Sequence, residues 1–126
     1  MKEFMLLIRN HADHQQSWSP EKHQKFLKAC ETYIGELMKE GKLIKAQPMI
    51  REGKMISGTK DAWHEAHYAD QKEVIVEYYH VFAKDLEDAV AVAKRNPEFE
   101  FAATARVEVR PIKTKEETTG FTYPKK

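Results

Sequence analysis

The sequence predicts an α+β domain of the ferredoxin-like type, with the element order strand, helix, strand, strand, helix, strand. Two runs, at 4–8 and 73–82, are apolar and rich in strand-forming residues. Two longer stretches, at 19–41 and 85–97, have helical periodicity and recognisable start and stop residues. In this topology the first and third main strands occupy the centre of the sheet, where the most apolar strands belong.

Length and composition limit the classes of protein to which the chain can belong. Its 126 residues are typical of one domain, and 21 basic residues nearly balance 20 acidic ones. This balance argues against nucleic acid or an anionic membrane as a partner, and no apolar run reaches the ~20 residues of a membrane helix. The single cysteine, Cys30, excludes an internal disulfide and favours a cytoplasmic location.

The first half of the chain begins with a strand and a well-delimited helix. The run "FMLLI" at 4–8 is flanked by charge, as a strand buried on both faces is. Ser19 is a suitable N-cap, Pro20 suits the first helical position and Gly41 suits a left-handed stop. Apolar residues at three- and four-residue steps predict a buried stripe along this helix: Phe26, Cys30, Tyr33 and Leu37. We expect Cys30 to pack in this stripe rather than to react.

Three further strands are predicted, separated by one long loop. The strand at 43–50 contains Pro48, which cannot donate to a ladder and therefore indicates a sheet edge or a bulge. From 58 to 71 the chain has the composition of a loop. The strand at 73–82 is the strongest in the chain, and 105–112 alternates apolar and charged residues, as a half-exposed strand does.

The second helix begins at Asp85 as its cap and ends at Asn96-Pro97. We place the domain at 1–112 and treat 113–126, which is mostly Lys, Thr and Glu, as a polar C-terminal tail.

The two central strands predict a homodimer. Both helices cover one face of such a sheet, yet the strands at 4–8 and 73–82 are apolar on both faces. The other face therefore needs a cover, and a second copy of the same sheet is the simplest one.

Several stretches together resemble the YCII-related domain family, and within it the DGPF branch. They lie in the expected order along almost the whole chain: "FMLLI" at 4–8, "WSPE" at 18–21, "KEVIVEYYHV" at 72–81, "KDLEDAVAVAKRNP" at 84–97 and "VEVRPI" at 107–112. The resemblance implies a dimeric α+β barrel, in which two ferredoxin-like sheets pack face to face. It implies no defined reaction, because the activity of the family is largely unassigned.

The Asp-Gly-Pro-Phe motif of that branch falls on Glu65, Ala66, His67 and Tyr68. The acid and the ring are kept, whereas Gly and Pro are replaced by Ala66 and His67. The substitution brings an imidazole to a place where the family has none. A histidine early in the first helix, which the resemblance places at the cleft, corresponds roughly to His23.

These residues predict a site for proton transfer. An imidazole beside a carboxylate is suited to moving protons near neutral pH, so Glu65, His67 and His23 are the candidate catalytic residues. Further candidates for ligand binding share aromatic or ionisable side chains: Trp18, His64, Tyr68, Glu77 and Tyr79. If strand alternation holds, Glu77 shares a face with Ile75, Tyr79 and Val81, and must find a partner or a wet cleft there.

A zinc site is the alternative interpretation of "HEAH" at 64–67. His64 and His67 can share one face of a helix, but the spacing is one short of the metalloprotease motif and no third ligand is indicated. We therefore predict no metal and no cofactor.

Two functions remain open at this point. One is a small-molecule enzyme with acid/base chemistry in a cleft near the 59–71 loop. The other is a non-catalytic small-ligand-binding or regulatory dimer that uses the same pocket.

Overall fold

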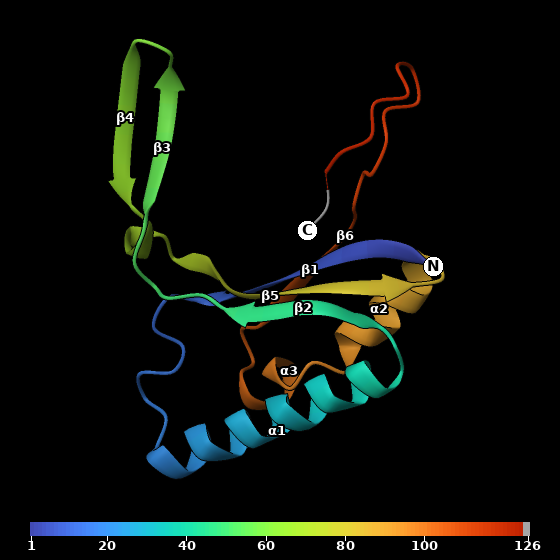
Figure 1. Cartoon of the computed structure of the whole chain (residues 1–126). Helices are drawn as coiled ribbons and strands as arrows, with labels where there is room; N and C mark the ends of the chain where they lie inside the picture. The colour runs from blue at the N-terminus through green and yellow to red at the C-terminus, as the bar shows by residue number, and fades with distance from the viewer. Residues whose placement is uncertain (125–126) are drawn as a thin grey trace.

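The computed structural model describes residues 1–124, which form a four-stranded antiparallel sheet with helices on one face and a separate two-stranded hairpin (Figure 1). The elements are β1 (Lys2–His11), α1 (Pro20–Lys39), β2 (Leu43–Pro48), β3 (Lys54–Thr59), β4 (Ala62–His67), a 3-10 turn η1 (Tyr68–Asp70), β5 (Glu73–Ala83), α2 (Leu86–Lys94), α3 (Glu98–Phe101) and β6 (Arg106–Pro111). The strand order of the main sheet is β2-β5-β1-β6. The predicted ferredoxin-like α+β fold is confirmed.

The two central strands, β1 and β5, are the most apolar ones, as predicted. Along β1, buried Phe4, Leu6 and Ile8 alternate with half-buried neighbours and face the helices. Tyr33 and Leu37 of α1 pack against this face and complete the core. Pro48 lies on the edge strand β2, where its missing N–H costs no ladder hydrogen bond.

The predicted helix ends are also present. The side chain of Ser19 accepts a hydrogen bond from the N–H of Lys22 at 3.1 Å, and that of Asp85 accepts one from the N–H of Asp88 at 2.9 Å. Gly41 follows α1 with a φ of 70°, the left-handed conformation that glycine adopts without strain. The short helix α3 was not predicted.

The predicted loop at 58–71 is wrong, because β3 and β4 form an antiparallel hairpin across it. Its turn, at Lys60 and Asp61, lacks the Gly or Asn that usually marks a hairpin. Gly58 makes the turn possible instead: its φ is 108°, and a Cβ there would lie 2.1 Å from the carbonyl oxygen of Ala62. Both strands of the hairpin are exposed at nearly every position, so their composition is that of a loop and does not predict a strand.

The predicted alternation along β5 is interrupted by a β-bulge. Ile8 of β1 pairs with Glu77, and the next residue, Arg9, pairs with Ile75, which leaves Val76 as the extra residue. Residues on the two sides of a bulge change face relative to simple alternation. Glu77 therefore shares the helix-covered face with Tyr79, as predicted, but Ile75 lies on the opposite face.

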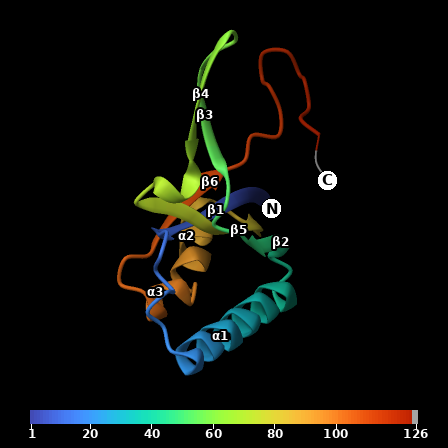
Figure 2. The same cartoon turned by 90° about the vertical axis from the view of Figure 1, so that its left-hand side faces the viewer.

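That opposite face of the sheet carries no helix. Figures 1 and 2 show the hairpin β3–β4 and the segment after β6 rising on this side, while α1, α2 and α3 lie on the other. Cross-strand pairs place Met5, Leu7 and Tyr78 near its centre, where each is only half-buried. The predicted tail turns at 117–119 and folds back on itself, so that Lys115 and Thr122 form an antiparallel bridge; its last two residues lie outside the described residues.

None of the helices within residues 1–124 has the length and apolar character needed to cross a bilayer.

Candidate functional site

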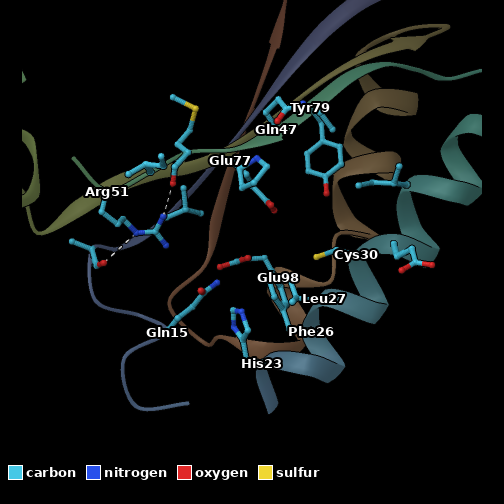
Figure 3. Close-up of a pocket in the computed structure, with 18 of the residues that line it drawn as sticks. Gln15, His23, Phe26, Leu27, Cys30, Gln47, Arg51, Glu77, Tyr79 and Glu98 are labelled. Carbon is cyan, nitrogen blue, oxygen red and sulfur yellow. Dashed lines mark hydrogen bonds between the residues drawn. The ribbon is translucent and has the colours of Figure 1, made fainter. Parts of the chain in front are cut away.

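A cavity of about 830 Å³ lies between the sheet and the N-terminal half of α1 (Figure 3). The segment after β1, the segment after β2 and the start of α3 close its sides. Much of its wall is apolar and is contributed by Phe26, Leu27, Ile34, Met49, Ile50 and Val76. A pocket of this size and lining is suited to a small organic molecule.

Glu77 is the central polar group of the cavity. Its carboxyl group points from β5 into the cavity, as Figure 3 shows. The residue is 8% exposed, and its Oε1 has no hydrogen-bond partner. Burial raises the pKa of Glu77 to about 7, and the negative charge of Glu98 adds to this increase. The side-chain amide of Asn96 and the positive charge of Arg51 favour the ionised form and make the increase smaller.

Glu98 forms the floor of the cavity and is held by a buried network. Its Oε1 accepts a hydrogen bond of 2.9 Å from Nδ2 of Asn10 and lies 2.6 Å from Nε2 of His14. Nε2 of His14 makes no hydrogen bond, so the two side chains are in close polar contact only. Thr104 in turn donates to Oδ1 of Asn10 at 2.6 Å. The carboxylate of Glu98 is therefore fixed in place.

Arg51 lies at the rim and joins the segment after β2, to which it belongs, to the segment after β1. Its Nε donates to the carbonyl of Ala12 at 3.2 Å, and its Nη1 donates to that of Met49 at 3.1 Å. Its Nη2 lies 3.2 Å from Nδ1 of His14. The same Nδ1 lies 3.2 Å from the carbonyl oxygen of His11, which can only accept, whereas a guanidinium can only donate, so the two contacts require opposite tautomers of His14.

Two further ionisable groups face the cavity in their neutral forms. Burial, with the charges of Glu77 and Glu98, raises the pKa of Cys30 to about 12, so this thiol is a poor nucleophile, as predicted. Burial also raises the pKa of Tyr79 far above its ordinary value, and Figure 3 shows its ring beside the cavity. The cavity thus combines one carboxyl group that titrates near neutrality with a phenol and a thiol that do not.

The family model of the YCII-related domain matches residues 2–113. The chain belongs to the YCII-related domain family. Comparison with curated proteins gives no match. The family match does not separate the branches of the family, so the DGPF assignment remains a prediction.

For this YCII-related chain, the structure places three of the predicted site residues at the cavity: His23, Glu77 and Tyr79. His23 is exposed at the mouth, one helical turn before Phe26. Trp18 does not line the cavity but closes its end from outside, with ring centroids 5.7 Å from His14 and 5.2 Å from Phe26.

The other predicted residues lie elsewhere. Glu65, His67 and His64 are exposed on β4, away from the cavity, and Glu65 pairs with Lys54 at 3.1 Å. Tyr68 follows them and is tied to β5, because its hydroxyl accepts a hydrogen bond of 2.8 Å from the N–H of Ile75. The structure therefore does not bring Glu65 and His67 together with His23.

The zinc interpretation needed a helix at 64–67, but β4 is a strand. His64 and His67, three residues apart, point to opposite faces there. Within the described part of the chain, no cluster of three His, Cys, Asp or Glu residues has the arrangement of a metal site.

The sequence did not single out four residues that build the site: His14, Arg51, Glu98 and Asn10. His14 lies in the polar segment after β1 and Arg51 lies between β2 and β3, where the surrounding sequence gives no sign of a site. Glu98 follows the helix stop Asn96-Pro97 and is only 1% exposed. The fold reveals this burial, and the sequence does not.

Proposed function

We propose that this YCII-related protein is a small-molecule enzyme in which Glu77 transfers a proton within the cavity between α1 and the sheet. The observation that supports the proposal is the environment of Glu77: a buried carboxyl with an unpartnered oxygen and a pKa of about 7. At neutral pH both its acid and its base forms are populated, which is the condition for general acid/base catalysis.

The surrounding residues favour this role. The carboxyl group of Glu77 points into a space that a substrate can fill, and the negative charge of the anchored Glu98 keeps the affinity of Glu77 for protons high. Tyr79 is neutral, so its hydroxyl group can donate a hydrogen bond to a negative charge that develops on the substrate during the reaction. Glu65 and His67 lie on β4, so they can contact only a ligand that extends from the cavity to the hairpin.

A metabolite screen by thermal shift, followed by a turnover assay on each hit, tests the proposal. Glu77→Gln should keep the fold but lower turnover at least about a hundredfold, the usual contribution of a positioned general base. Glu117→Gln, the same charge change on the exposed tail, is the matched control. Turnover that survives Glu77→Gln would contradict the proposal, and a hit that binds without turnover would favour the non-catalytic ligand-binding dimer.

We further propose that the protein is a homodimer through the open sheet face and resides in the cytoplasm. Half-buried Met5, Leu7 and Tyr78 on that face gain cover if a second sheet packs on them. The hairpin and the segment after β6 stand on the same side and would flank the second copy (Figure 2). The single cysteine supports a reducing compartment.

A further inference from the structure

The cavity has an unbalanced set of charges. Four carboxylate side chains line it: Asp13, Glu31, Glu77 and Glu98. Among its described lining residues, Arg51 is the only lysine or arginine. The donors of Arg51 already point at the carbonyls of Ala12 and Met49 and at His14. These contacts engage three of the five N–H groups of Arg51, and the four acidic side chains outnumber its single positive charge, so the wall favours a cationic ligand over an anionic one.

Glu77 is the group that a ligand would meet. It is more than nine-tenths buried, its Oε1 has no hydrogen-bond partner, and it projects into the cavity (Figure 3). A buried carboxyl oxygen without a partner is costly, and a ligand that supplies a donor removes this cost. The negative charge of Glu98 on the floor favours a donor that is positively charged.

The walls determine the rest of the ligand. Phe26, Ile34 and Met49 surround the approach to Glu77 with apolar surface. The cavity volume of about 830 Å³ admits a ring or a branched chain together with a head group.

From these observations we infer that the cavity takes a small organic cation, with an ammonium or amidinium head against Glu77 and an apolar body against α1. The inference rests on the proposed function, since it names the substrate class of that same site. The proposed function concerns turnover, whereas this inference concerns the charge of the ligand that the cavity prefers.

Three probes of nearly equal size test it by calorimetric titration of the full chain: phenethylamine, phenethyl alcohol and hydrocinnamate. The amine should bind at least about tenfold more tightly than the alcohol and the carboxylate. Glu77→Gln should remove this preference, and Glu117→Gln should preserve it. The three-probe comparison on the unmodified protein needs no variant, so it stands even if Glu77→Gln fails to fold.

Several results would overturn the inference. They are equal or tighter binding of the alcohol or the carboxylate, no amine binding at millimolar concentration, and an amine preference that persists in Glu77→Gln. If the neutral or anionic probe binds best and Glu77→Gln weakens it, the charge preference fails while the proposed use of Glu77 stands. If turnover of an identified substrate ignores Glu77→Gln, the proposed function fails instead.

Discussion

Nε2 of His14 lies 2.6 Å from Oε1 of Glu98, with only 2% and 1% of the two side chains exposed. One residue comes from the polar segment after β1 and the other from the first turn of α3. The contact therefore ties together two segments that are remote in the sequence, at the point where both close the cavity.

His14→Ala should lower the free energy of unfolding by about 3 kcal/mol, because Glu98 loses a partner in a buried site and Arg51 loses its contact with Nδ1. Denaturant unfolding measures the change. His64→Ala on the exposed hairpin is the matched control and should stay within about 0.5 kcal/mol. Equal effects of the two substitutions would show that the His14–Glu98 contact contributes nothing.

The raised pKa of Glu77 predicts a specific dependence of stability on pH. The folded protein holds this proton up to about pH 7, whereas the ordinary value of 4.5 applies after unfolding. Between these values the folded state binds more protons, so its stability falls as pH rises from 4.5 toward 7 and stays lower above. The total loss is ~3 kcal/mol at one pKa unit per 1.36 kcal/mol.

Glu77→Gln should remove this loss, and denaturant unfolding across that pH range in both proteins measures it. The other charged and titratable groups that line the cavity stay unchanged in the variant: Asp13, His23, Cys30, Glu31, Arg51, Tyr79 and Glu98. The same pH dependence in the two proteins would mean that Glu77 has an ordinary pKa.

The dimer proposal predicts that a single polar substitution on the open face separates the protomers. Leu7 lies between Tyr78 and Glu108 in the centre of that face and is half-buried. Leu7→Lys would place a charge inside the proposed interface, so sedimentation at micromolar concentration should find monomers of the variant and dimers of the unmodified chain. Leu86→Lys, on the exposed surface of α2, makes the same change on the helix side and should leave the dimer intact. A monomeric unmodified chain would refute the proposal.

Much of the fold could be predicted from local signals, but the site could not. Ser19, Gly41 and Asp85 act on their own neighbours, so the sequence around each of them is enough to predict a helix end. The bulge at Val76 depends on how β5 pairs with β1, which is a contact between distant segments. Predicted alternation put Glu77 on the correct face but Ile75 on the wrong one for this reason.

The network under the cavity was out of reach for a similar reason. Asn10, His14 and Glu98 are ordinary surface residue types that become buried only when β1 and α3 meet. The hairpin was missed in the opposite way, since its strands gain little from burial and so lack the apolar alternation that identifies a strand.

The hairpin itself gives the last prediction. Isolated two-stranded hairpins are marginally stable in water, and this one exposes 60% of Ile56 and 63% of Trp63 on one face. It rises beside the open sheet face, so a second copy on that face would cover it (Figure 1). Trp63 should therefore become buried when the dimer forms.

Fluorescence reports that burial directly. Trp18→Phe leaves Trp63 as the sole tryptophan, since the sequence has two. Its emission should shift to longer wavelength on dilution and in Leu7→Lys, because the indole passes from the interface into water. Phe121 and Tyr123, which pack on each other in the tail with centroids 5.3 Å apart, are kept in both variants. An emission maximum that is already that of a solvated indole in the concentrated dimer would place the hairpin outside the interface.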